Sequence, residues 1–310
     1  HYDAQLHWDP YCTISGWHGV TSVAIGNCGF GFAPAKKELR ERLLLMMTRT
    51  EQIPYESMVE GVGLDWDWET LPEWMDHLER LPKGVNVLNY VPLNPLMVYV
   101  MGLEAAKSGE PATPEQLAEM KRLVNEGMDA GMMGFAIQRL GKHSLQADFD
   151  GTPMPTDCMD DGDLLALAGV LAERGEGFIQ TIQAQHGDPL KNGEKKDLEF
   201  VEKLAEAAQR PILYNVVAAV DDYPEAHKDG LKWLADCNAR GLRIYGQGLT
   251  VRSPFQFTLE DWNLYDSSPA WNEATQGTTE ERLKKLADPE IRKRMIDEDE
   301  TLITLGVGGP

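Results

Sequence analysis

The sequence has little cysteine and no long hydrophobic run. Its four cysteines, at positions 12, 28, 158 and 237, show no Cys-x-x-Cys spacing. This pattern excludes a dense disulfide framework and a zinc ribbon, and it indicates a reducing compartment, so we expect a cytoplasmic protein. No stretch approaches the roughly twenty apolar residues of a membrane-spanning helix, and the first residues do not resemble a targeting signal.

Basic residues are also few, with 29 lysines and arginines against 50 acidic residues and a formal net charge of -21. Binding to nucleic acid or to an anionic membrane needs clustered positive charge, so the sequence argues against both partners. The 310 residues and a hydrophobic content of 42% allow one large core. Because no internal repeat or low-complexity linker divides the chain, we expect residues 1–310 to form a single domain.

Short β-branched runs alternate with longer helical patterns through most of the chain, which is typical of βα units and a parallel sheet. Most of the runs are almost entirely apolar, as strands covered on both faces should be. The expected strands are 20–26, 85–91, 134–138, 178–183, 212–217 and 242–246.

Helix signals lie between these strands. Thr113 is followed by a proline and, three residues on, by Gln116, which predicts a capping box and a helix start. Asp197 is predicted to cap a second helix. The other expected helices are 36–47, 71–81, 163–174, 225–240 and 279–296.

These strands and helices predict an α/β fold. Six regular strands, together with one that is truncated at the start of the chain, fall short of eight. We therefore expect an incomplete (β/α)8 barrel, in which the functional residues lie at the carboxyl ends of the strands.

Two groups of residues fall at such strand ends. Cys28 follows the 20–26 strand between Gly26 and Gly29, where a thiolate would be a strong zinc ligand and the glycines leave room for a metal. Its alternative role is that of a buried, unreactive thiol. His1 and Asp3 are two residues apart, so on an extended strand both would project to one side, although they could equally be a frayed end.

The run His-Tyr-Asp-Ala-Gln at 1–5 and the run Gly-Asn-Cys-Gly at 26–29 together resemble the metal-binding opening of the N-acyl-D-amino-acid deacylases, a branch of the amidohydrolase superfamily. The resemblance implies one or two zinc ions, with His1 and Cys28 as ligands. In that family His1 would be the second member of a His-x-His pair. The chain therefore resembles a piece of a longer protein.

The loop after the 134–138 strand carries Arg139 and His143, and an Asp-Gly turn follows at 150–151. Deacylase-like proteins often have an arginine and a histidine in this loop, so the resemblance implies that both bind substrate. Arg139 would hold a substrate carboxylate through two hydrogen bonds. A surface arginine beside an ordinary turn is the equal alternative.

The sequence departs from the family where zinc-ligand histidines follow the fifth and sixth strands. Gln183 and Asn215 stand there instead, and amides are weak zinc ligands, so we retain both as substrate-binding candidates. His186 is a possible substitute ligand or a solvated loop residue. The family's acid/base aspartate after the last strand has no counterpart before Pro310, which leaves the catalytic residue unknown.

The function implied by this resemblance is metal-dependent hydrolysis of an amide carbon–nitrogen bond in a small molecule, such as an N-acyl-D-amino acid. The alternative is a homologue that binds a small ligand without hydrolysing it, or an inactive fragment. Because a ligand and the acid/base group are missing from residues 1–310, we expect this segment alone not to hydrolyse such amides.

Overall fold

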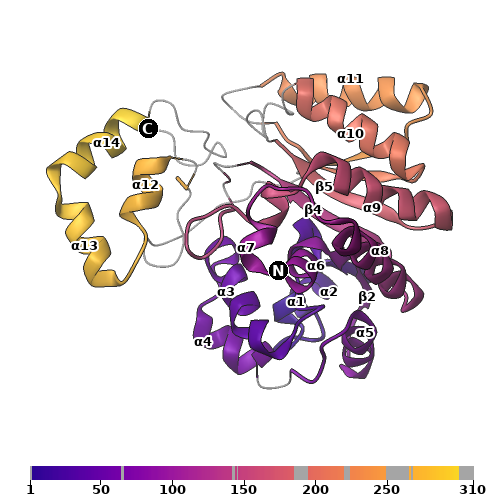
Figure 1. Cartoon of the computed structure of the whole chain (residues 1–310), viewed down its shortest axis with the longest axis horizontal. Coiled ribbons are helices and arrows are strands. Elements are labelled where there is room, and N and C mark those ends of the chain that lie inside the picture. Colours follow the sequence, from indigo (N-terminus) through magenta and orange to yellow (C-terminus); the bar gives the residue numbers. More distant parts are fainter. Residues whose placement is uncertain are drawn as a thin grey trace.

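A computed structural model describes residues 2–63, 66–141, 144, 146–184, 195–219, 224–248, 265–266 and 268–299. Within them the chain has an α/β fold built on parallel sheets (Figure 1). Helices α8 to α11 lie along one side of the strands, and the helices nearest the C-terminus form a separate group at the other end of the molecule.

All strand pairs in the described residues are parallel, as the sequence predicts. One sheet pairs β1 with β2, and the other has the order β3-β4-β5-β6-β7. The strands are β1 Ser22–Ile25, β2 Asn86–Asn89, β3 Val91–Pro92, β4 Gly134–Arg139, β5 Phe178–Gln183, β6 Ile212–Val217 and β7 Ile244–Gly248. The six predicted spans are therefore confirmed to within a few residues, with 85–91 divided between β2 and β3.

The two sheets meet at Asn89 and Tyr90. The Tyr90 N–H donates to the carbonyl of Ile25 at 3.1 Å, and the Met133 N–H donates to the carbonyl of Asn89 at 2.9 Å. The segment that holds β2 and β3 is thus bonded to β1 on one side and to the start of β4 on the other. The strands follow one another in space in the order of the sequence, which is the arrangement of successive right-handed βα units.

Fourteen α-helices lie in the described residues. They are α1 Tyr2–Gln5, α2 Thr13–Trp17, α3 Arg40–Glu51, α4 Tyr55–Met58, α5 Leu71–Arg80, α6 Leu93–Met101, α7 Leu103–Ala106, α8 Pro114–Asp129, α9 Asp161–Arg174, α10 Lys195–Ala208, α11 Ala226–Ala239, α12 Pro269–Ala274, α13 Thr279–Ala287 and α14 Pro289–Asp299. Short 3₁₀ turns occur at η1 Asn27–Gly29, η2 Lys37–Leu39 and η4 Pro155–Cys158, and a π-helical turn at η3 Val59–Gly63.

Local sequence signals explain several of these helices. The predicted capping box of α8 is present, because the Gln116 N–H donates to the Thr113 hydroxyl at 3.2 Å and the Thr113 N–H donates to the Gln116 side chain at 2.9 Å. Helix α9 begins after Asp160, whose carboxylate accepts from the Gly162 N–H at 2.8 Å. Each interaction satisfies backbone donors that a helix start leaves free.

The main core lies between the strands and the helices that cover them. Fully buried side chains from α8, α9 and α10, including Val124, Leu167 and Leu204, pack with Phe135 of β4 and Ile179 of β5. Apolar burial of this extent is the main favourable term in folding. It also fixes which face of each strand is turned away from the helices.

Three local predictions are wrong. Residues 2–5 form α1 rather than a truncated strand, and the Leu6 N–H donates to the Tyr2 carbonyl at 2.9 Å, so the backbone is satisfied locally. Helix α10 begins at Lys195, which places Asp197 inside its first turn rather than at its cap. The predicted 279–296 helix is divided into α13 and α14, because Pro289 disfavours helical geometry at the residue before it.

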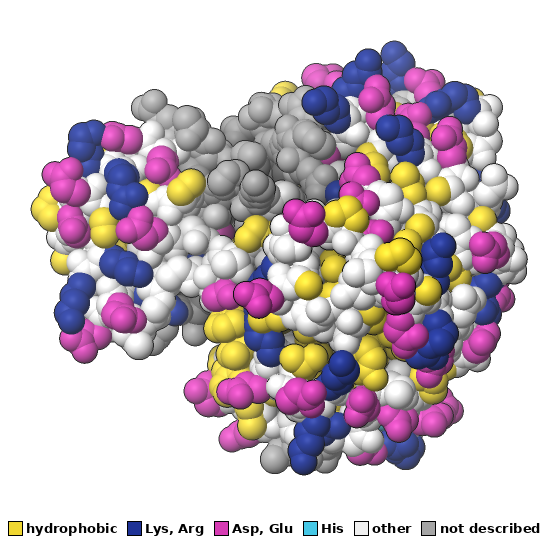
Figure 2. All heavy atoms as spheres, in the orientation of Figure 1, with side chains coloured by type: hydrophobic (Ala, Val, Ile, Leu, Met, Phe, Trp, Pro, Cys, Tyr) yellow, Lys and Arg dark blue, Asp and Glu magenta, His cyan; other side chains and the backbone are white. Residues whose placement is uncertain are grey.

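On the face shown in Figure 2, acidic and basic side chains alternate over α13 and α14. Hydrophobic side chains are more frequent on the central part of the same face. No helix in the described part of the chain is long and apolar enough to cross a membrane.

Candidate functional site

The turn after β1 brings Cys28 against the neighbouring strands. Its backbone is left-handed at three positions, with φ of 85° at Gly26, 56° at Cys28 and 80° at Gly29. A Cβ on Gly26 would lie 2.9 Å from the Tyr90 carbonyl oxygen, and one on Gly29 would lie 2.9 Å from the Ala136 carbonyl oxygen. Only glycine fits these two positions, so the spacing of the motif is what lets the turn pack against β3 and β4.

Cys28 is buried beside Gln180 of β5. The Cys28 N–H donates to the Gln180 side-chain oxygen at 2.5 Å, and the Gln180 amide nitrogen lies 4.0 Å from the sulfur. Burial, together with the negative charge of Glu51 and Asp157, raises the pKa of the Cys28 thiol to about 12. The surroundings therefore favour the neutral thiol, and a nearby cation would be needed to hold it as a thiolate.

Strand register shows which polar side chains share a face with Gln180. Gln138 and Asn215 both pair with Ile182, which is two residues from Gln180, so the three amides lie on one face that we call the inner face. The Gln138 Oε1 and Asn215 Oδ1 atoms are buried and have no hydrogen-bond partner among the described residues. Unpaired buried acceptors are costly, so these oxygens are suited to receive a donor from a bound molecule or water.

Arg139 and Gln183 lie on the opposite face. They pair with each other across β4 and β5 and point toward α9 and α10. The Arg139 guanidinium forms an ion pair with Asp161 at 2.7 Å and lies 4.7 Å from the centre of the Phe200 ring. The Gln183 amide donates to Asp197 at 2.9 Å. The structure therefore does not bring these two substrate-binding candidates to Cys28.

Asp3 is brought to the Cys28 turn. It is buried on α1, and its carboxylate accepts the Gly26 N–H at 2.8 Å, which ties the N-terminal helix to the start of the turn. A surface cavity of about 220 Å³ opens beside it and is lined by Tyr2, Asp3, Gln5, Ala24 and Asn27. His1, His143 and His186 lie outside the described residues.

Asp157 is a second buried acid near the site, and the sequence analysis missed it. Its carboxylate accepts the Leu140 N–H at 2.7 Å and the Gln138 amide at 2.8 Å. Burial raises its pKa to about 7, despite these hydrogen bonds. No motif marked Asp157. The strand period places positions 180 and 183 on opposite faces, but it does not indicate which of the two faces the Cys28 turn.

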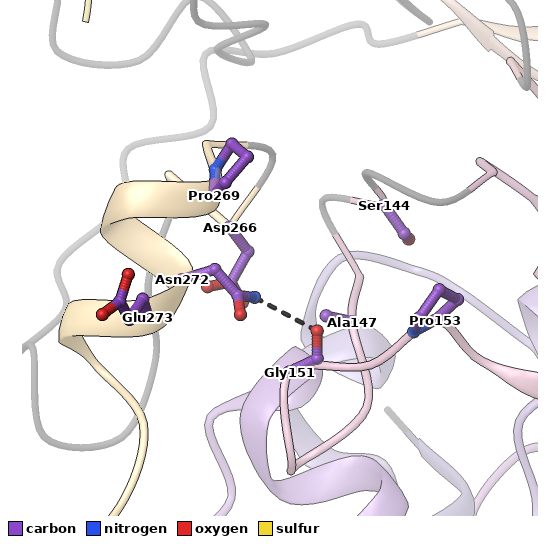
Figure 3. A pocket seen from close by; sticks show the side chains of 8 residues that line it. All are labelled: Ser144, Ala147, Gly151, Pro153, Asp266, Pro269, Asn272 and Glu273. Atoms are coloured by element: carbon purple, nitrogen blue, oxygen red, sulfur yellow. Dashed lines mark hydrogen bonds between the residues drawn. The ribbon is translucent and has the colours of Figure 1, made fainter. Parts of the chain in front are cut away.

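The loop after β4 is fixed by an ion cluster. Asp148 is fully buried and binds both Arg42, at 2.9 Å, and Lys107, at 2.5 Å. The Gly151 carbonyl accepts from the Asn272 amide at 3.2 Å, which connects the loop to α12 (Figure 3). These contacts hold the Asp-Gly turn in place and leave Asp148 without a free oxygen for catalysis.

A cavity of about 230 Å³ lies between this loop and α12 (Figure 3). Its lining residues are Ser144, Ala147, Gly151, Pro153, Asp266, Pro269, Asn272 and Glu273. Both carboxylates in the lining are already paired, Asp266 with Arg49 and Glu273 with Arg294. The cavity therefore offers little acid–base chemistry, and the Cys28 turn is the better candidate site.

The residues that the structure describes contain no group of three histidines, cysteines or carboxylates placed to hold a metal ion. Cys28 is the ligand candidate among them that sits at a strand end, and its predicted partner His1 is outside the described range. The buried Cys28 sulfur is a donor type that suits zinc, and the negative charge of Glu51 and Asp157 disfavours its thiolate unless a cation is bound.

No family model matches the chain. In sequence it is similar to an uncharacterised protein of Mycobacterium tuberculosis, with 30% identity over 177 residues, which are 56% of this chain and 28% of that protein. It is also similar to the N-acyl-D-aspartate deacylase of Alcaligenes xylosoxydans xylosoxydans, with 29% identity over 134 residues, or 43% of this chain and 24% of the deacylase. The chain spans about a quarter of the length of these relatives.

In structure the chain is similar to a D-aminoacylase, with a TM-score of 0.58, 18% identity, and coverage of 81% of this chain and 46% of the enzyme. An N-acyl-D-glutamate deacylase from Bordetella bronchiseptica, solved with zinc and a phosphonate inhibitor, has a TM-score of 0.54, 16% identity, and coverage of 78% and 44%. The resemblance expected from the two N-terminal motifs is therefore confirmed in the fold, because the chain has a fold similar to that of the D-aminoacylases.

Proposed function

We infer that the protein is a metal-dependent hydrolase that cleaves the amide bond of an N-acyl-D-amino acid or a related small amide. The observation that carries this proposal is the Cys28 turn, in which a buried sulfur is held at the carboxyl end of a parallel strand against Gln180. The unpaired amide oxygens of Gln138 and Asn215 lie on the same face of the sheet as Gln180. The deacylases to which the chain is similar act on N-acyl-D-aspartate and N-acyl-D-glutamate by their names, which supports this substrate class.

The proposed scaffold is a (β/α)8 barrel in which residues 1–310 belong to one domain. Support comes from the order of the strands, because β1 to β7 follow the sequence around the sheet and are joined through Asn89 and Tyr90. In such a barrel the inner face would become the interior, and the Cys28 turn would lie at its catalytic end.

Cys28, as a thiolate, and His1 would hold one or two zinc ions in this proposal. When bound, zinc polarises an amide carbonyl and lowers the pKa of water. The role of Gln180 is to fix the turn through its bond to the Cys28 N–H. Asp3 does the same from the other side through the Gly26 N–H.

Among the substrate-binding candidates, Asn215 fits a direct role best, since its free oxygen on the inner face would accept an amide N–H of the substrate. Arg139 and Gln183 fit positioning roles, because they brace the ends of β4 and β5 against α9 and α10. His143 stays a candidate on the basis of the resemblance.

The test measures zinc and activity in the protein as it is encoded in its genome. We expect elemental analysis to find zinc, Cys28→Ser to reduce it sharply, and free amino acid to be released from N-acyl-D-amino acids in a chelator-sensitive way. Cys158→Ser is the matched control, because Cys158 lies in η4 after the β4 loop. Zinc content that does not change in Cys28→Ser would reject the metal role of Cys28.

A protein that binds an N-acyl amino acid without cleaving it is the second candidate. The observation that favours it is the presence of amides, Gln183 and Asn215, near the ends of β5 and β6, where a zinc enzyme would benefit from imidazoles. A zinc-loaded protein whose melting temperature rises with N-acyl-D-amino acid, and which releases no amino acid, would support this second function.

A further inference from the structure

A surface cavity lies at the end of the strands that is opposite the Cys28 turn. Its volume is about 340 Å³, and it is lined by Ala205, Glu206, Gln209, Arg210, Gly241, Leu242 and Arg243. These residues belong to α10, to the turn before β6 and to the turn before β7. The two turns are adjacent, because the Ile212 N–H donates to the Arg243 carbonyl at 2.9 Å. The cavity is therefore at the amino ends of β6 and β7.

The two cavity arginines, Arg210 and Arg243, are each held by one backbone carbonyl. Arg210 Nε donates to the Gly177 carbonyl at 3.1 Å, and Arg243 Nη2 donates to the Gln209 carbonyl at 2.8 Å. These bonds explain why arginine is favourable at the two turns, but each bond uses only one of the five N–H groups of a guanidinium. Both side chains are thus positioned in advance and keep donors for a ligand.

No carboxylate among the described residues balances the cavity arginines. Most arginines in the described part of the chain form an ion pair with an acid. The acids nearest in sequence are already taken, because Glu176 pairs with Arg174 at 2.5 Å and Glu202 pairs with Arg240 at 2.9 Å. Glu206 lines the cavity but forms no ion pair with either cavity arginine. The lining therefore carries two positive charges against one negative charge.

We propose that this cavity binds the phosphate group of a small molecule through Arg210 and Arg243. The site is separate from the one at Cys28 and does not depend on the proposed function. A phosphate group presents enough oxygens to accept from both planar guanidiniums at once, and its two negative charges match the two arginines. A carboxylate has two oxygens and one charge, so it would leave one guanidinium unmatched. The bound group would tie together the turns that begin β6 and β7.

The experiment measures the melting temperature of the full-length protein in inorganic phosphate and in chloride, at neutral pH and equal ionic strength. A ligand that binds only the folded protein raises its melting temperature. We expect a saturable rise with phosphate, and an apparent affinity about tenfold weaker in Arg210→Gln and in Arg243→Gln. Arg292→Gln is the matched control and should keep the full rise, since Arg292 is an exposed arginine of α14.

Glu206→Gln guards against arginine variants that fail to fold. It keeps both cavity arginines and removes the negative charge from the lining, so we expect phosphate to bind about two- to fivefold more tightly. A rise that is the same in the wild type, Arg210→Gln and Arg243→Gln would show a general salt effect and would overturn the proposal. An affinity that does not increase in Glu206→Gln would also contradict it.

Two further probes identify the kind of ligand. Glycerol phosphate that binds more tightly than inorganic phosphate would show that the natural ligand is a phosphorylated small molecule. Inorganic phosphate that binds while glycerol phosphate does not would show that the site takes free phosphate. Acetate that raises the melting temperature as much as phosphate, with the same loss in Arg210→Gln, would overturn the assignment to a phosphate group.

Discussion

The part of the chain that carries the sheet and the helices near its C-terminus are held together in different ways. The sheet body, which is the described part of residues 2–248, has one continuous apolar core drawn from every strand region. The C-terminal unit, which comprises the described residues from 265 to 299, buries only Ala270, Ala274 and Met295 in a small cluster of its own (Figure 1). So little apolar burial contributes only a few kcal/mol, at about 25 cal/mol per Å².

The C-terminal unit is attached through polar contacts instead. The Arg49 guanidinium of α3 donates to Asp266 at 2.6 Å and to the Thr275 hydroxyl at 2.9 Å, and all three side chains are buried. Asn272 adds the hydrogen bond to the loop after β4. Buried ion pairs specify one arrangement but add little net stability, so the unit should be well positioned and weakly held.

The largest effect is expected from Asp266→Ala, which leaves Arg49 buried without its counter-charge. We expect docking of the C-terminal unit to weaken by about 3–5 kcal/mol, so that protease cuts α12 to α14 away while the sheet body stays folded. Limited proteolysis with mass spectrometry measures this. Arg294→Ala, which removes an exposed pair within the unit, should cost less than about 1 kcal/mol. If protease degraded the sheet body and the C-terminal unit together, the two parts would not differ in stability as we expect.

Leu167→Ala tests the apolar side of the comparison. Leu167 is fully buried in α9, so its truncation should lower the free energy of unfolding of the sheet body by about 2–5 kcal/mol. Met295→Ala is the counterpart in the C-terminal unit and should leave the main transition unchanged. Denaturant unfolding followed by circular dichroism measures the main transition in both variants. An equal shift in both would show that the sheet body and the C-terminal unit do not unfold separately.

The pH dependence of stability should come from the sheet body through Asp157. Its pKa of about 7 is above that of an unfolded aspartate, so its contribution is complete below about pH 4 and is lost as pH rises through 7. Between pH 5 and 8 this loss should be roughly 2–3 kcal/mol. Asp157→Asn should flatten the profile measured by urea unfolding, and an unchanged slope would show that Asp157 is not the source.

The smallest effect comes from two matched helix caps. Thr113 begins α8 in the sheet body and Thr278 begins α13 in the C-terminal unit, each with a complete capping box. Removing either hydroxyl with alanine should cost about 1 kcal/mol. We expect Thr113→Ala to lower the main unfolding transition, and Thr278→Ala to speed hydrogen exchange only in α13. Equal effects of both variants on the main transition would argue against independent stability.

Sequence alone predicted the strands of the sheet body well, because their signals are local. A run such as 212–217 is apolar and bounded by Pro211, and the Thr113 cap is complete within four residues. The N-terminal strand was inferred from the resemblance rather than from strand-forming residues. In the structure those residues form α1.

The site was harder to predict because it depends on which way strand residues face. In a strand that is buried on both sides the alternation of polar and apolar residues is lost, so the sequence did not distinguish Gln180 from Gln183 or Gln138 from Arg139. Register resolved these pairs in the structure. Contacts such as that between Cys28 and Gln180 join positions 152 residues apart, and no local pattern reports them.

The left-handed backbone at Cys28 has a consequence for stability. For an L-residue with a φ of 56°, the conformational free energy is about 1–2 kcal/mol less favourable than for glycine in the same conformation. Replacement of Cys28 by glycine would therefore make the chain more stable. A side chain held in this conformation costs stability, and backbone strain of this kind clusters at functional sites.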